Sequence, residues 1–506
     1  MAINFIPNDP SAKELSTPRA QAKRKNRPAG RAGFTFADPP AEGRFEPGTT
    51  EFLFWQTREA ALAAVEAWEQ VAGTLKAWQG NRKRLPLLRD EGSTLNAFYD
   101  RSTFSFFHRQ FEDTTFFSGA STDVVAHEVG HGLLDSLRPD LWDAAFLEAG
   151  AFHEAFGDCI AILTALHDRE TRVDLLAATK TLKKANFVES TSEDLAFAIR
   201  RVQANHNAAE PRHAFNDFRF QIPETLSLDG GPGTLINEVH SFGMLFSGCF
   251  YDLIAGLFAA QPNKTEASLL KAAQTAGTLL IRGAAAAVVT PRFFQSVGRA
   301  MVLADDQING SANRERIRQA FEGHNIMLGA NALLAPSALL AGRAPTVHGG
   351  ASLGKAARRD LAARLGVSPQ AKVHVASVDV GGQRFASVVH SKRVALDDVD
   401  PRLRGVVMET AVPVIVGASG GRAAVMGAMP EPTSTEREVQ AFVRSLIGHG
   451  QVEMPGGTPS PAAAARGPAA ATRSRRGRAT PEVVRETHRV VGKRLVRVRF
   501  ACGCGG

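Results

Sequence analysis

The pentapeptide His127-Glu128-Val129-Gly130-His131 constrains this chain more than any other feature. On an α-helix, positions i and i+4 lie on the same face, so the two imidazoles can bind one metal ion. Glu128 lies about 100° further round the helix, where its carboxylate can reach a water molecule beside the metal. The pentapeptide therefore predicts a helix that carries part of a metal site.

A second segment, Gly150–Asp158, supplies the remaining groups that such a site needs. Glu154 offers a carboxylate as the third ligand. Asp158 follows one helical turn later, where it can hold a histidine ligand by its outer nitrogen. Two histidines and one carboxylate leave the fourth position of a Zn²⁺ ion open, which is typical of a catalytic site. The pattern predicts that His127, His131 and Glu154 bind Zn²⁺.

A chance match on a surface helix is the alternative, because short motifs give false positives. The residues before the motif, Ser121-Thr122-Asp123, are good N-capping residues, and we expect Asp123 to be an N-cap without bound calcium. Apolar residues dominate the rest of the segment, and a polar face on a buried helix is costly unless something such as a metal compensates it. The apolar positions are Val124, Val125, Val129, Leu133 and Leu134.

Several further segments carry a family resemblance that covers roughly residues 50–330. The chain resembles the thermolysin-like zinc metallopeptidases, a gluzincin family with HExxH and a downstream glutamate ligand. The segments that carry the resemblance are Asn96–Asp100, Phe117–Gly119, Asp123–His131, Gly150–Asp158, Val239–Gly243 and Ile317–Ile326.

The resemblance implies a role for individual residues of this chain. Glu128 would be the general base that takes a proton from the metal-activated water, and His240 would stabilise the oxyanion. Asn96 and the backbone of Ala97 would hold the substrate as an added strand at a sheet edge. Arg212 would grip a substrate carbonyl. The alternatives are a core histidine for His240 and a solvated surface arginine for Arg212.

The chain also departs from the pattern of that family. The family often has a tyrosine between the two metal-binding segments as a second oxyanion donor, but Trp142 and Phe146 stand there in this chain. The usual carboxylate partner of the late histidine is replaced by Leu235. Either Asn237 or Glu238 then orients His240.

Composition limits the other classes of function. The net charge of +8 is concentrated at the two ends, so an association with nucleic acid through basic termini is one alternative, and solvated tails are another. A catalytically weak zinc protein is a third. The sequence predicts no membrane span and no recognisable signal peptide, hence a cytoplasmic location by default. Cys159 and Cys249 read as buried free thiols, whereas Cys502 and Cys504 read as part of an unstructured tail, with a thiol–metal role as the alternative.

The predicted fold is α+β, a thermolysin-like metallopeptidase with a mainly helical C-terminal lobe and a small C-terminal α+β module. Four parts follow along the chain: a disordered basic segment over 1–45, the metallopeptidase domain over 46–340, the small module over 350–450, and a linker with a basic tail over 451–506. We expect the tail to be dispensable for catalysis. The predicted activity is that of a zinc metalloendopeptidase acting on peptide or protein substrates.

Overall fold

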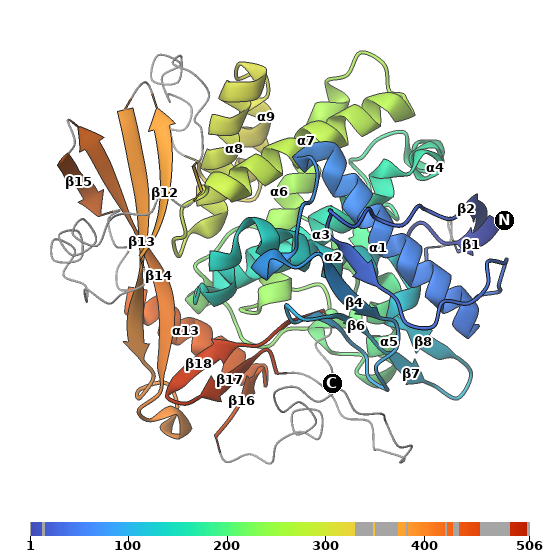
Figure 1. The fold of residues 1–506 in the computed structure, drawn as a ribbon, viewed down its shortest axis with the longest axis horizontal. Coiled ribbons are helices and arrows are strands. Elements are labelled where there is room, and N and C mark those ends of the chain that lie inside the picture. Colours follow the sequence, from blue (N-terminus) through green and yellow to red (C-terminus); the bar gives the residue numbers. More distant parts are fainter. Residues whose placement is uncertain are drawn as a thin grey trace.

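The computed structural model describes residues 2–12, 16–328, 348–349, 373–380, 383–419, 422–428, 435–455 and 486–502. Helices and strands are mixed in it (Figure 1), and the predicted α+β class with a mainly helical second lobe is confirmed.

The N-terminal segment is folded over its described residues, so the prediction that residues 1–45 are disordered is wrong there. Strand β1 (Ala2–Phe5) pairs antiparallel with β2 (Arg19–Ala22), and β3 (Gly33–Thr35) joins a larger sheet. Ile3 and Phe5 are buried, and basic residues of the segment pair with helix carboxylates, for example Arg27 with Glu69. Paired charges and a few apolar anchors hold a chain whose average composition suggests disorder.

Helix α1 spans Thr50–Ala72 and lies between strands β3 and β4 in the chain. The Thr49 side chain caps it by accepting from the amide of Phe52. It ends at Gly73, whose φ of 78° lies in the region that favours glycine.

A five-stranded sheet lies beside the central helices, in the order β19-β5-β6-β4-β3. Strand β19 comes from the other end of the chain and pairs antiparallel with β5, which it covers as the edge strand. A separate hairpin, β7–β8, follows this sheet. The remaining strands of the two sheets are β4 (Arg84–Leu88), β5 (Ala97–Tyr99), β6 (Phe104–Phe106), β7 (His108–Gln110), β8 (Thr115–Phe117) and β19 (Phe500–Ala501).

The helices pack around two central ones, α2 (Thr122–Leu137) and α3 (Leu147–His167) (Figure 1). Helices α3 and α6 are long and apolar enough to cross a membrane, but the apolar windows are 100% and 83% buried inside the protein, as in core helices. The others are α4 (Arg169–Thr179), α5 (Glu193–Val202), α6 (Val239–Ala259), α7 (Glu266–Ala286), α8 (Phe293–Asn309) and α9 (Arg314–Gly323), with the short strands β9 (Ser190–Thr191) and β10 (Arg212–His213).

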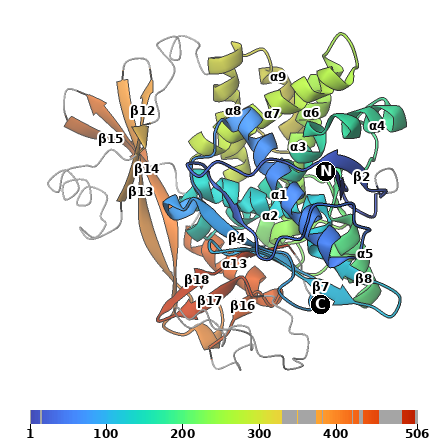
Figure 2. The same cartoon turned by 45° about the vertical axis from the view of Figure 1, so that its right-hand side comes forward.

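The C-terminal part forms an eight-stranded sheet, ordered β11-β12-β13-β14-β18-β17-β16 with β15 on β14, beside helix α13 (Figure 2). Part of the predicted module lies outside the described residues, and so does most of the predicted linker. The elements are β11 (His348–Gly349), β12 (Val373–Val380), β13 (Gln383–Ala395), β14 (Val407–Ser419), β15 (Arg422–Ala428), α13 (Thr435–Gly448), β16 (Val452–Glu453), β17 (His488–Val491) and β18 (Arg494–Arg497).

One apolar core runs through both halves of the protein. It includes Phe152 of α3 and Phe246 of α6, and also Phe442 of α13 and Phe500 of β19. The predicted basic tail is therefore not a free tail over 486–502, because its strands join two sheets and its side chains enter the core. The domain boundaries themselves stay a prediction.

Candidate metal centre

Helix α2 begins where the sequence predicts, but with a different cap. The Ser121 hydroxyl accepts from the amide of Val124 at 3.3 Å, which makes Ser121 the N-cap. Asp123, the predicted N-cap, instead lies in a buried group with Asp9 and Glu193. Asp9 comes from the N-terminal segment for which the sequence predicts disorder, and this folded segment brings it to Asp123.

The two central helices cross at glycines, and this brings the two metal-binding segments together. A Cβ at Gly130 would lie 2.8 Å from the Cα of Gly157. This close approach lets His127 Nδ1 donate to Asp158 Oδ1 at 2.9 Å. Asp158 therefore has the predicted position at the outer nitrogen of His127.

The three predicted ligands meet. The ligand atoms of His127, His131 and Glu154 all lie within 4.8 Å of one another, on fully buried or nearly buried side chains. Glu154 Oε2 lies 3.2 Å from His127 Nε2 and 3.6 Å from His131 Nε2. Ligands about 2.0–2.2 Å from a tetrahedral zinc ion are themselves about 3.3 Å apart, so the spacing suits zinc.

The electrostatics of the group also suit a cation. His131 Nε2 is buried without a hydrogen-bond partner among the described residues, as a metal-facing nitrogen would be. Burial opposes charge on His127, but Cys502, Asp158 and Glu154 raise the pKa of this imidazole to about 10. The neighbours of His127 thus favour positive charge at this point.

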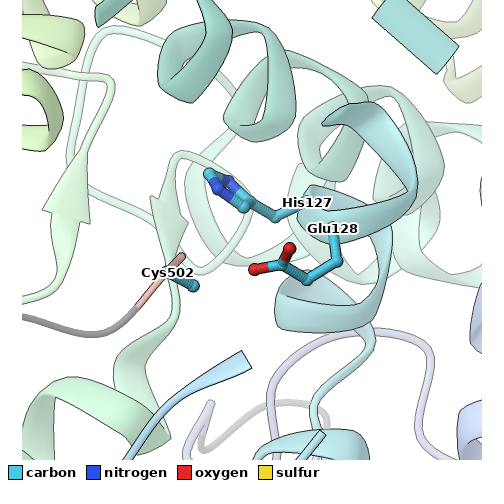
Figure 3. Close-up of side chains that lie close together, drawn as sticks. All are labelled: His127, Glu128 and Cys502. Atoms are coloured by element: carbon cyan, nitrogen blue, oxygen red, sulfur yellow. The ribbon is translucent and has the colours of Figure 1, made fainter. Parts of the chain in front are cut away.

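Glu128 is fully buried and neither carboxylate oxygen has a hydrogen-bond partner in the described part of the chain. Burial, and then the neighbouring Cys502, raise the pKa of Glu128 well above its ordinary value. Figure 3 shows its carboxylate beside the His127 ring and pointing towards Cys502. An unpaired buried carboxylate is costly, so its position next to the ligand group calls for a functional reason.

His153 orients the second histidine ligand, and sequence reasoning missed it. Its Nδ1 lies 3.0 Å from Nδ1 of His131, so a His131 that binds metal through Nε2 donates to it. The signal was its place directly before Glu154, on the same helical segment. The ring of Phe500 lies over both imidazoles, with centroids 3.8 Å from His153 and 4.7 Å from His131.

His240 begins helix α6 and reaches the same group. Its Nε2 lies 3.2 Å from Glu154 Oε2, and its Nδ1 donates to Glu238 Oε1 at 2.7 Å. The other oxygen of Glu238 caps the helix by accepting from two backbone amides. Of the two orienting residues that the sequence left open, Glu238 has this contact, whereas the Asn237 carbonyl accepts from Ser445. His240 is part of the site and not a remote core histidine.

Arg212 also lies in the site, on strand β10. Its Nε donates to Asp158 Oδ1 at 3.0 Å, and its Nη2 lies 3.5 Å from the sulfur of Cys502. The alternative of a solvated surface arginine is therefore wrong. Arg212 holds Asp158, which in turn accepts from the outer nitrogen of His127.

The predicted substrate strand is at the sheet edge, where another segment of the chain covers it. Asn96 is buried, and its side-chain oxygen accepts from the amide of Ala97. The carbonyl of Ala97 accepts from the amide of Cys502 at 2.9 Å. The reading of Cys502 as part of an unstructured tail is wrong, since its side chain is 3% exposed and lies in the site. Cys159 and Cys249 are buried free thiols as predicted, and Cys504 lies outside the described residues.

The two tyrosines of the chain are engaged elsewhere. Tyr99 donates to Asp135, and the hydroxyl of Tyr251 accepts from Asn186. Trp142, which stands in the segment where a tyrosine was expected, donates from its indole nitrogen to the carbonyl of Arg497. No tyrosine therefore accompanies His240 at the ligand group.

A comparison with protein families matches residues 38–332 to the fungalysin metallopeptidase (M36) family, which is more than half of the 506-residue chain. No curated protein matches the chain in a sequence search. This is a gluzincin-type family of zinc-dependent peptidases, and the predicted resemblance to thermolysin-like enzymes is a coarser match to it. The family match gives no support to a nucleic-acid function or to a catalytically weak zinc protein. The HExxH helix, the glutamate that reaches it from α3 and the match over residues 38–332 together show that this chain belongs to the fungalysin family of zinc metallopeptidases.

Proposed function

We propose that this chain is an endopeptidase whose site is built from the residues that meet on α2, α3 and α6. His127, His131 and Glu154 hold the zinc ion of the family, and Asp158 and His153 fix the two imidazole rings. When bound there, zinc supplies Lewis acidity and makes a nucleophile of water near neutral pH.

Glu128 is the general base in this proposal, and its isolation is the observation that carries it. Both of its oxygens are buried and unpaired among the described residues, beside the ligand group. The raised pKa that burial produces suits a carboxylate that takes a proton from the attacking water and returns it to the leaving amine. No structural contact would be lost by making this carboxylate neutral.

His240 donates to the oxyanion in the transition state. Bonded through Nδ1 to the Glu238 carboxylate and able to donate from Nε2, it does both at once as an imidazolium. Burial would raise the pKa of Glu238, but the charge and hydrogen bond of His240 lower it to about 2. The carboxylate is thus a lasting counter-charge for this histidine.

The substrate backbone adds to β5 through Asn96 and Ala97, and Arg212 is the candidate for a contact to a substrate carbonyl. Arg212, Glu238 and His240 are among the residues that line a cleft of about 770 Å³. Pairing along this edge needs an extended stretch of substrate backbone, which supports cleavage within a polypeptide rather than at its end.

The experiment measures zinc content and casein hydrolysis on the same purified sample, with Glu128→Gln as the paired variant. We expect about one zinc per chain in both proteins and hydrolysis that a chelator abolishes. Glu128→Gln should lose at least about a hundredfold in turnover, because an amide cannot accept the proton. Zinc-loaded Glu128→Gln that hydrolyses casein within about tenfold of the unmodified chain contradicts the general-base assignment.

A further inference from the structure

The segment that covers the site is a short strand from the far end of the chain. Phe500 and Ala501 pair antiparallel with Tyr99 and Phe98 of β5, and the amide of Cys502 donates to the carbonyl of Ala97. This is the edge at which a substrate backbone would add to the sheet. Strand β19 and a bound substrate therefore exclude each other.

A backbone carbonyl of this strand accepts a hydrogen bond from His240, the proposed oxyanion donor. His240 Nε2 donates to the backbone oxygen of Ala501 at 2.8 Å. The next residue, Cys502, turns its side chain towards α2 (Figure 3). The strand thus presents its backbone to His240 as a substrate would, and it presents a thiol where the reaction would occur.

The thiol lies beside His127, one of the three predicted zinc ligands. The sulfur of Cys502 and the ligand atoms of His127 and Glu128 all lie within 4.8 Å of one another. This group shares His127 with the three predicted zinc ligands. The sulfur also receives two contacts from the Arg212 guanidinium, at 3.5 and 3.6 Å. A thiolate is a strong ligand for zinc, with a bond of about 2.3 Å, and a fourth position is open for it.

Aromatic contacts hold the strand in place. Phe500 is 1% exposed and stacks on His153, with the Trp142 ring edge-on to it at 5.3 Å. The Arg497 guanidinium lies over the Phe500 ring, 4.2 Å from its centroid, and its Nε donates to the Trp142 carbonyl. These contacts anchor the strand two residues before Cys502.

We propose that Phe500–Cys502 is a built-in inhibitory segment and that the Cys502 thiolate is the fourth ligand of the zinc ion. The inference rests on the proposed peptidase function. Binding would release the thiol proton to solvent and put the sulfur in place of the water molecule at the fourth coordination position, which is the position that catalysis needs. Dissociation of the segment would make the fourth coordination position available to water and the edge of β5 available to substrate. It would also leave His240 Nε2 able to donate to the oxyanion.

The first test is spectroscopic and needs no turnover. The full chain is loaded with Co²⁺ in place of zinc, and its near-ultraviolet absorption is compared with that of Cys502→Ser. Cys504→Ser is the matched control, because it removes the neighbouring thiol of the same Cys-Gly-Cys sequence. We expect a sulfur-to-cobalt charge-transfer band in the unmodified chain and in Cys504→Ser but not in Cys502→Ser. A band that persists in Cys502→Ser, or its absence from all three proteins with cobalt bound, overturns the inference.

The second test measures casein hydrolysis after the inhibitory segment has been weakened. Cys502→Ser should hydrolyse casein about tenfold faster or more, since a segment bound in about nine-tenths of molecules leaves about a tenth competent. Cys504→Ser should stay at the unmodified rate. Alkylation of the metal-free unmodified chain, followed by reloading with zinc, should give the same increase in hydrolysis without a mutation, and mass spectrometry should place the label on Cys502 only when the metal is removed before alkylation.

The outcomes separate this inference from the proposed function. A Cys502-dependent cobalt band without hydrolysis in any variant keeps the ligand assignment and refutes the peptidase proposal. Equal hydrolysis by the unmodified chain and Cys502→Ser, with no band, refutes the inhibitory segment and keeps the peptidase. An intact mass showing cleavage between Ala501 and Cys502 overturns the inhibitory segment, because β19 would then be a substrate.

Discussion

Gly157 on α3 lies directly against the imidazole of His127 on α2: a Cβ at Gly157 would lie 2.6 Å from Nδ1 of that ring. The same nitrogen donates to Asp158, the next residue along α3. The absence of a side chain at Gly157 therefore allows the metal-binding helix and the orienting carboxylate to approach each other.

Gly157→Ala should lower zinc affinity without removing any ligand. The added methyl group forces the His127 ring or helix α3 to shift, because a Cβ contact under 3.0 Å is not tolerated. We expect a loss of about tenfold to a hundredfold in zinc affinity, the range found when an orienting partner of a ligand is lost. Competition with a chelator of known affinity measures it.

The control is Gly256→Ala at a half-buried position of α6, where the nearest atom to a new Cβ is 4.0 Å away. It should leave zinc affinity unchanged and stabilise the protein by about 0.5–1 kcal/mol, because alanine loses less backbone entropy in a helix. Equal zinc affinities for the two variants would show that the close approach does not position His127.

His131→Ala and Glu154→Gln should each lose bound zinc, because the remaining groups no longer enclose the ion on three sides. Elemental analysis of dialysed protein measures the loss. His108→Ala, on hairpin β7–β8 beside Asp90, is the control and should keep its zinc. Full zinc occupancy in His131→Ala would mean that the ion is bound elsewhere.

His240→Ala should keep zinc and lower kcat by about 10²–10³, the usual effect of removing one oxyanion donor. His240 also bonds to Ala501 of the covering strand, so the loss is measured in a Cys502→Ser background, where release of the segment cannot mask it. Loss of zinc from this variant would make His240 a ligand, since its Nε2 lies 3.2 Å from Glu154.

The buried acidic group Asp9, Asp123 and Glu193 should make stability fall as pH rises. Burial, then the charge of Asp194, raises the pKa of Asp9 to about 7, and burial with the charges of Asp9 and Asp123 raises that of Glu193 to about 10. The folded chain then holds protons that the unfolded chain releases above about pH 4. The contribution of these protons to the free energy of unfolding is complete below that pH, and it is lost as the pH rises through about 7 and then about 10.

Urea unfolding over a pH series measures this dependence. Glu193→Gln should flatten it, because an amide at this position has no proton to lose. Glu210→Gln, which removes a half-exposed partner of Arg200, should leave the curve unchanged. A Glu193→Gln protein as pH-dependent as the unmodified chain would contradict the assignment.

The local parts of this protein could be predicted from the sequence because they depend on fixed spacings. Helical periodicity places His127 and His131 on one face of their helix. In the same way, the four-residue spacing places Glu154 and Asp158 on one face of the second helix. Glu238 could be named as a partner of His240 because it stands two residues away. Each of these relationships is set by backbone geometry within one or two turns.

The sequence did not predict what depends on contacts between distant segments. Composition suggested disorder for the first 45 residues and a free basic tail at the other end, yet Asp9 joins the group around Asp123 and Phe500 stacks on His153. Cys502 enters the site directly after strand β19, far from α2 in the chain. Burial of a few aromatic rings and pairing of charges outweigh the average polarity of such segments.

The local sequence was enough to predict a helix with His127 and His131 on one face, because the i and i+4 spacing of an α-helix leaves little choice. The backbone that lies at the edge of β5 could be recognised only in the folded chain. A sheet edge offers unpaired amides and carbonyls to any extended segment that reaches it. The local sequence pattern of β5 does not indicate which segment this is or how far away it lies in the chain. Here Phe500–Cys502 takes that place, with the thiol of Cys502 against the Glu128 carboxylate.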